Sequence, residues 1–180
     1  MTAFTLRPVD PLADAPTLHR WVTHPKCRFW QMAYHDVAQV QQAYVEIDEN
    51  PTHDAFLGLV DDEPAFLVER YDPAGDPVGE VYAVQPGDAG MHVLVAPTDS
   101  PVPGFTRDVF ATVMDWLFED PTVQRVVVEP DAANHAVHAL NAWAGFTVHE
   151  RVRLPGKDAL LSFCTRDDHV ASATRRGAAA

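Results

Sequence analysis

The order of elements between residues 90 and 163 constrains the fold of this 180-residue chain more than any other feature. Two apolar runs of strand length, at 91–95 and 125–129, enclose a stretch of helical period at 105–118. Apolar side chains recur there every three or four residues, which is typical of an amphipathic helix. Strand, loop, helix and strand in this order predict a βαβ unit with two parallel strands. Such units place ligands at the carboxyl ends of their strands.

The rest of the chain supplies elements that could extend this unit into a sheet covered by helices. We expect further strands at residues 3–9, 55–60, 64–71, 78–84, 146–154 and 160–165, and further helices at 12–22, 36–48 and 133–144. The sum predicts an α/β or α+β domain with a mixed central sheet of about seven strands. We expect one domain over residues 1–166, followed by a loose polar tail over 167–180 that shows no periodicity.

The net charge of the chain limits which classes of molecule it can bind. Thirteen basic and 26 acidic side chains give a formal net charge of −13. Binding to nucleic acid requires clustered Lys and Arg, so we expect no nucleic-acid partner. An acidic field attracts a cationic small molecule, although the carboxylates could serve solubility alone.

Compartment and metal content are also constrained by the sequence. Cys27 and Cys164 form neither a disulfide framework nor a zinc-binding spacing. The first ten residues contain an arginine and an aspartate where a signal peptide would be apolar, and no segment approaches membrane-spanning length. We therefore expect a cytoplasmic protein, monomeric or homodimeric, with no membrane partner and no metal.

Two side chains of the βαβ stretch have the chemistry of proton transfer. His92 lies on the strand at 91–95, and Asp131 directly follows the strand at 125–129. The unperturbed pKa of histidine lies near neutrality, which suits a general base. Each residue also has a purely structural interpretation. His92 could be a histidine whose ring is hydrogen-bonded beneath a loop, and Asp131 could cap the next helix. His135 and His138 have a spacing that metals use, but no third ligand is near in sequence.

Several strings of the sequence resemble one family. MHVLVAP, VVVEPDAANHAVHALNAWAGF and LPGKDALLSFCTR in the second half, with FWQM and FLVERYD in the first, resemble the GNAT acyltransferases that acylate amines and hydroxylamines in hydroxamate siderophore biosynthesis. The resemblance is greatest to the branch that acylates N-hydroxycadaverine on the way to desferrioxamines. It implies the GNAT fold and an acyl-CoA co-substrate, either succinyl-CoA or acetyl-CoA.

The resemblance also implies roles for individual residues. His92 and Asp131 fall on the catalytic pair of that branch. The coenzyme A pyrophosphate would meet the turn at 101–106, where only Gly104 keeps the family's glycine pattern. The residues implied to bind the cofactor are Val93, Val95, Gly104, Phe105, Thr106, Arg107 and Asn134. Trp30, Glu69 and Tyr71 would line the acceptor channel, where Glu69 or Tyr71 could hold the far ammonium of a diamine.

The resemblance predicts direct transfer of the acyl group to an N-hydroxylated diamine, without a covalent enzyme intermediate. Two alternatives remain open. One is a GNAT enzyme with another acceptor, such as N-hydroxylysine, a polyamine or an aminoglycoside. The other is a domain that binds acyl-CoA without turnover, which the glycine-poor turn would suit.

Overall fold

The computed structural model describes residues 4–178 and contains seven strands, five α-helices and three short 3-10 helices within them. The strands are β1 (Thr5–Pro8), β2 (His53–Val60), β3 (Glu63–Tyr71), β4 (Asp88–Val95), β5 (Arg125–Val128), β6 (Thr147–Leu154) and β7 (Lys157–Thr165). The helices are α1 (Ala15–Val22), η1 (Pro25–Trp30), α2 (Val37–Glu49), η2 (Pro73–Gly75), η3 (Pro77–Glu80), α3 (Phe105–Glu119), α4 (His135–Ala144) and α5 (Arg166–Ala178).

The strands form one mixed sheet in the order β1-β2-β3-β4-β5-β7-β6. β4 and β5 are parallel, with Asp88 opposite Arg125 and Gly90 opposite Val127. β1 with β2, β5 with β7, and β6 with β7 are antiparallel. The predicted βαβ unit is therefore confirmed as β4-α3-β5, and the predicted mixed sheet of about seven strands is confirmed as well.

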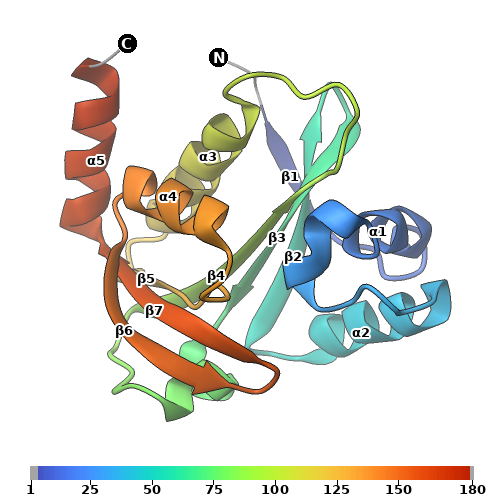
Figure 1. The fold of residues 1–180 in the computed structure, drawn as a ribbon, viewed down its shortest axis with the longest axis horizontal. Coiled ribbons are helices and arrows are strands. Elements are labelled where there is room, and N and C mark those ends of the chain that lie inside the picture. The colour runs from blue at the N-terminus through green and yellow to red at the C-terminus, as the bar shows by residue number, and fades with distance from the viewer. Residues whose placement is uncertain (1–3, 179–180) are drawn as a thin grey trace. The chain divides into compact units, whose positions relative to one another are not determined.

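The chain divides into two units, which are described separately. The first extends to Arg70 and includes His92–Val109, and the second comprises Tyr71–Met91 and the chain from Phe110 onward. In the first unit, α1 packs against α2 (Figure 1), and side chains of both helices form a core with the strands. That core contains Leu18, Trp21, Val22, Val40, Tyr44, Leu57, Leu67 and Leu94.

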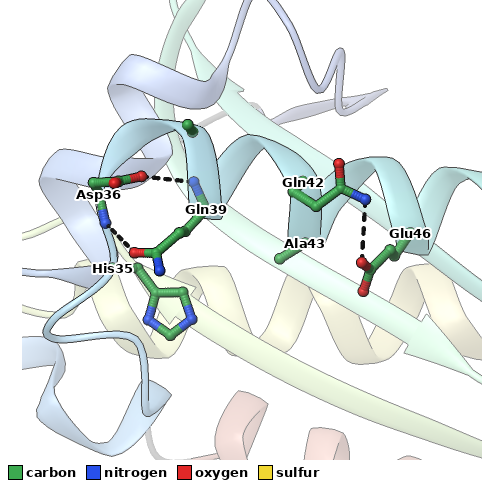
Figure 2. A pocket seen from close by; sticks show the side chains of 7 residues that line it. His35, Asp36, Gln39, Gln42, Ala43 and Glu46 are labelled. Carbon is green, nitrogen blue, oxygen red and sulfur yellow. Dashed lines mark hydrogen bonds between the residues drawn. The ribbon is translucent and has the colours of Figure 1, made fainter.

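Local sequence chemistry explains the ends of the elements in the first unit. The Asp36 carboxylate accepts a hydrogen bond from the Gln39 backbone N–H, and the Gln39 side chain accepts one from the Asp36 N–H (Figure 2), which forms a capping box for α2. The β2–β3 hairpin turns at Asp61 and Asp62, whose φ angles of 51° and 66° are those of a tight two-residue turn. Both the helix at 36–48 and this hairpin were predicted from the sequence.

In the second unit, the β6–β7 hairpin and the strand β5 form the core with Tyr71 and Val78. α4 begins after Asn134, whose side chain accepts a hydrogen bond from the Val137 N–H, and ends at Gly145 in the left-handed region. The N-cap expected at Asp131 therefore lies three residues later. α4 and α5 lie beside each other (Figure 1).

Two predictions in the first half of the chain are wrong. Residues 78–84 form no strand, because the carboxylates of Asp72 and Asp76 cap two successive 3-10 turns that begin at Pro73 and Pro77. The helix expected from residue 12 begins at Ala15, after Asp10 caps the turn at residues 12 and 13. The start of the first predicted strand, Ala3, lies outside the described residues.

The third wrong prediction is the loose tail. Residues 166–178 instead form α5, which buries His169 and Ser172. The Ser172 hydroxyl donates to the Ala144 carbonyl at the end of α4, at 2.9 Å. The His169 ring stacks on Phe118 at a centroid distance of 4.9 Å, and its Nε2 lies 2.8 Å from the Asp115 carboxylate. These contacts fix a helix that has few apolar residues of its own.

Candidate active site

The carboxylate of Glu69 is the centre of a buried polar network in the first unit. Glu69 lies on β3 and is only 6% exposed. Its Oε1 accepts a hydrogen bond from the Tyr44 hydroxyl at 3.1 Å, and its Oε2 lies 3.0 Å from His92 Nδ1. His53 Nε2 lies 3.5 Å from the same Oε2, at the limit of hydrogen-bonding distance, so any hydrogen bond there is weak.

Three different elements bring the partners of Glu69 to it, and a fourth supports His92. His53 begins β2, His92 lies on β4, and Tyr44 comes from the inward face of α2. Trp30 ends η1 and packs its ring edge-to-face on the His92 imidazole, with the ring centroids 6.1 Å apart and the planes at 78°. Burial and the Glu69 charge raise the pKa of Tyr44 by more than the nearby Trp30 side chain lowers it. His92 is thus held by an aromatic ring on one side and by a carboxylate on its Nδ1.

The environment of Glu69 sets its ionisation. Burial raises the pKa of Glu69, but the hydrogen bonds and the charges of His53 and His92 outweigh burial and bring the pKa to about 2. The carboxylate is therefore ionised at neutral pH and can only accept hydrogen bonds. It follows that His92 Nδ1 carries the hydrogen in this contact, and that Nε2 of a neutral His92 carries the lone pair.

Tyr44 acts as a donor in the same network. Burial raises the pKa of Tyr44 well above its ordinary value, and the neighbouring Glu69 charge raises it further. The hydroxyl therefore keeps its proton at neutral pH. It satisfies the Glu69 oxygen that faces away from the imidazoles.

The start of α3 presents the features of an anion site. Gly104 precedes the helix with a φ of 86°, and a Cβ at this position would meet no atom within 4 Å, so the space beside it is open. Thr106 and Arg107 lie in the first turn, whose backbone N–H groups have no acceptor within the helix. Phe105 packs its ring against Phe4, with the centroids 5.7 Å apart. The predicted cofactor residues 104–107 therefore lie together, and they fit a phosphate group.

The loop that leads to this helix is tied to η1. Lys26 Nζ donates to the Thr98 carbonyl at 2.9 Å. At the end of β4, the Ala96 N–H donates to the Ala65 carbonyl, so pairing with β3 continues to the last residue before the loop. Val93 and Val95, which we expected to bind the cofactor, are half-buried on β4.

The remaining predicted site residues belong to the second unit. The Asp131 carboxylate accepts a hydrogen bond from the Ala133 N–H at 2.8 Å, and Asn134 caps α4. The Tyr71 hydroxyl donates to the buried Glu129 carboxylate at 2.7 Å, and Lys157 Nζ lies 3.3 Å from its other oxygen. The structure thus brings Trp30, Glu69 and His92 of the predicted set into one network.

Sequence reasoning missed two members of the Glu69 network. Tyr44 recurs with the apolar face of its helix and so gives no sign of a polar role, and His53 precedes the strand expected at 55–60. A signal for both existed in the glutamate within the apolar run PAFLVERY. A buried carboxylate requires polar partners, and these had to come from neighbouring elements.

The described residues present no second site that would compete with the Glu69 network. A surface hollow on α2 is lined by His35, Asp36, Ala38, Gln39, Gln42, Ala43 and Glu46. Its polar side chains are engaged with one another in the capping box and in a Gln42–Glu46 hydrogen bond (Figure 2). Between residues 4 and 178, no three His, Cys, Asp or Glu side chains are grouped so as to hold a metal ion. In the same range, no helix is long and apolar enough to cross a membrane.

The mixed sheet with its β4-α3-β5 unit is the fold of the GNAT acyltransferases. The chain belongs to the acetyltransferase (GNAT) domain family, whose model matches residues 10–154. The aminoglycoside acetyltransferase AAC(6')-Ib, solved in complex with coenzyme A, has the same fold. Its TM-score is 0.82 at 22% identity over 94% of this chain and 98% of that chain.

Two curated relatives are acyltransferases named for hydroxylysine and for lysine. The N(6)-hydroxylysine O-acetyltransferase of Escherichia coli is 30% identical over 90% of this chain and 52% of its own length. The lysine N-acyltransferase MbtK of Mycobacterium sp. (strain MCS) is 28% identical over 80% of this chain and 59% of its own length. The chain therefore spans little more than half the length of these two relatives.

Proposed function

We propose that this protein is an N-acyltransferase of hydroxamate siderophore biosynthesis, which moves a succinyl or acetyl group from acyl-CoA to an N-hydroxylated diamine such as N-hydroxycadaverine. The observation that carries the proposal is the contact of 3.0 Å between His92 Nδ1 and the ionised Glu69 carboxylate, on the central strand of a GNAT fold. That contact leaves Nε2 as the basic nitrogen, which is the form a general base requires.

The acceptor class follows from the relatives and from the charge. The two curated relatives are named for hydroxylysine and lysine as substrates. N-hydroxycadaverine has the same hydroxylaminoalkyl chain as N(6)-hydroxylysine but lacks the carboxylate. A protein with a net charge of −13 favours the acceptor that carries only positive charge.

The start of α3 would hold the co-substrate. The backbone N–H groups of Thr106 and Arg107, the open space beside Gly104 and the positive end of the helix dipole suit a pyrophosphate. We propose that Phe105 and Asn134 add contacts to the same co-substrate. Acyl-CoA supplies an activated thioester carbonyl, which the backbone N–H groups of Val93 and Val95 would polarise.

The transfer balances without any further reactant. The acceptor nitrogen forms a C–N bond to the acyl carbon, and the C–S bond of the thioester breaks. His92 Nε2 takes the proton from the attacking nitrogen and returns it to the departing sulfur, so the products are the hydroxamate and the free thiol of coenzyme A. Because Nδ1 already donates to Glu69, the proposed catalytic role of Asp131 is toward the acceptor rather than toward this ring nitrogen. Trp30 would line the acceptor channel, whereas Tyr71 is buried in the core of the second unit and donates to Glu129, which does not fit the role expected for it.

Steady-state rates test the proposal. N-hydroxycadaverine, cadaverine and N-hydroxylysine are each offered with acetyl-CoA and succinyl-CoA, with thiol release measured and products identified by mass spectrometry. We expect the highest kcat/KM for N-hydroxycadaverine. Preference for N-hydroxylysine would keep the acyltransferase but change the acceptor. Thermal stabilisation by acyl-CoA with no thiol release for any acceptor would refute enzymatic function.

Two substitutions test the assigned residues. His92→Ala should lower kcat by roughly 10²–10⁴-fold, the range for a positioned base, while acyl-CoA still binds. Asp131→Asn keeps the side-chain acceptor that receives the Ala133 N–H, so stability should change little while kcat falls. Turnover near that of the wild type in His92→Ala would refute the mechanism.

A further inference from the structure

We infer that Glu69 is a positioning residue for His92: its carboxylate fixes the imidazole in the tautomer with hydrogen on Nδ1 and stabilises the imidazolium formed during transfer. The inference rests on the proposed function, because it assigns His92 as the base. It replaces the role expected from the sequence, in which Glu69 would hold the far ammonium of the acceptor.

The contacts of Glu69 favour positioning over direct binding of the acceptor. Tyr44 occupies Oε1, and Oε2 faces both His92 and His53. The Glu69 side chain is 8% exposed, whereas that of His92 is 32% exposed. An ammonium group would have to displace a buried partner to reach the carboxylate. The imidazole therefore lies between the carboxylate and the accessible surface.

The tautomer follows from the ionisation of the carboxylate. A neutral imidazole can carry its hydrogen on either nitrogen, and only one of the two forms leaves Nε2 basic. A carboxylate beside Nδ1 selects that form, because it cannot donate. It also lowers the energy of the imidazolium by its charge. A carboxylate orients the catalytic histidine in the same way in serine hydrolases, where replacing that carboxylate by an amide lowers kcat by roughly 10⁴-fold.

His53 and Tyr44 keep the carboxylate in place. The Tyr44 hydroxyl donates to Oε1 and so fixes the rotation of the carboxylate plane. His53, whose side chain is 17% exposed, approaches Oε2 from β2 while His92 approaches it from β4. Glu69 thus has a donor for each oxygen from the elements packed around it, and His92 is the most exposed of the imidazoles it contacts.

The first test reads the tautomer without any need for turnover. In ¹⁵N-labelled protein at a pH where His92 is neutral, long-range ¹H–¹⁵N correlations show which ring nitrogen carries hydrogen, with His92→Gln used to assign the signals. We expect hydrogen on Nδ1 in the wild type and a shift toward Nε2 in Glu69→Gln, whose amide can donate. Hydrogen on Nε2 in the wild-type protein would overturn the inference, and this outcome does not depend on how any variant folds.

The second test separates positioning from acceptor binding. We expect Glu69→Gln to lower kcat by roughly 10²–10⁴-fold with little change in the acceptor KM. Glu69→Asp keeps the charge and should recover part of the loss. Glu46→Gln, the same change on the exposed face of α2, should leave both constants unchanged. A raised acceptor KM with unchanged kcat in Glu69→Gln would instead show that Glu69 binds the acceptor, and would overturn the inference.

Failure of the inference and failure of the proposed function give different results. If His92→Ala keeps turnover near that of the wild type, then the proposed base is wrong, whatever the tautomer. If His92→Ala is inactive but Glu69→Gln keeps its kcat and its Nδ1 hydrogen, then the base is right and only the positioning role of Glu69 fails.

Discussion

Glu69 stays ionised although it is buried, because polar groups on three neighbouring elements replace the water it has lost. Burial alone would raise the pKa of the carboxyl, and an isolated buried glutamate would become neutral. The imidazoles of His53 and His92 reverse that effect and hold the pKa at about 2. The free-energy cost of burying this carboxylate is therefore offset only while its hydrogen-bonding partners are in place.

This network predicts how stability depends on acidity. The pKa of Glu69 is about 2 in the folded protein against an ordinary 4.5, so its contribution is present above pH 4.5 and is lost as the pH falls toward 2. A difference of that size corresponds to at most about 3 kcal/mol. Urea unfolding of wild type and Glu69→Gln at pH 5 and pH 2.5 measures it. The gap between the two free energies of unfolding should shrink at the lower pH, and an unchanged gap would contradict the prediction.

At the scale of the elements, one ion pair joins the starts of the two parallel strands. Asp88 and Arg125 stand opposite each other in the β4–β5 register. Their side chains make two contacts of 2.7 Å, Nε to Oδ1 and Nη2 to Oδ2, and the guanidinium lies 4.1 Å from the centroid of the Phe163 ring. Burial raises the pKa of Asp88, but the hydrogen bonds from Arg125, the Gln85 N–H and the Tyr82 hydroxyl, together with the Arg125 charge, outweigh burial and lower it.

This geometry requires the planar guanidinium of an arginine. Arg125→Lys keeps the charge but loses both the bidentate fork and the contact with the ring, so we expect a loss of about 1–3 kcal/mol. Arg151→Lys is the matched control, because Arg151 pairs with Asp158 at the exposed surface and should change stability by less than about 0.5 kcal/mol. Urea unfolding of both variants gives the comparison. Equal losses would show that the fork contributes nothing beyond its charge.

The turn before α3 gives a second prediction at this scale. Gly104→Ala places a methyl group in the open space beside the proposed phosphate site, at a φ of 86°. We expect the KM for acyl-CoA to rise roughly five- to tenfold, which is about 1 kcal/mol of lost binding. Gly156→Ala, at a φ of 78° in the β6–β7 turn, introduces similar backbone strain at another place. If both variants, or neither, raise that KM, the co-substrate does not bind at Gly104.

Elements with a strong period of their own were predictable from sequence, and elements held by distant contacts were not. The apolar repeat of α3 and the two-residue turn of the β2–β3 hairpin are encoded within a few residues. α5 carries little apolar surface and is fixed by Phe118 and Ala144, far away in the sequence. The site divides in the same way. His92 could be proposed from its strand, but its Glu69 partner depends on how β3 and β4 align, which no local pattern specifies.

At the scale of the whole molecule, the net charge of −13 acts in opposite directions on the two proposed substrates. A cationic hydroxylamine is drawn toward the protein, whereas the phosphates of acyl-CoA are repelled by its overall field and must be held locally. Salt shortens the reach of this field from about 30 Å at 0.01 M to about 8 Å at 0.15 M. Both effects should therefore weaken together as salt is added.

Raising the salt concentration from 0.01 to 0.15 M should increase the KM for N-hydroxycadaverine and decrease the KM for acyl-CoA. Each KM should change by a few-fold, on the order of the smallest rate effects that electrostatic steering produces. N-hydroxypentylamine, which keeps the hydroxylamine and lacks the far ammonium, is the control, and its KM should respond much less. Initial rates at fixed pH, with either substrate varied against saturating partner, give all three values. If the cationic and neutral acceptors respond alike, then the carboxylates serve solubility and do not steer the acceptor.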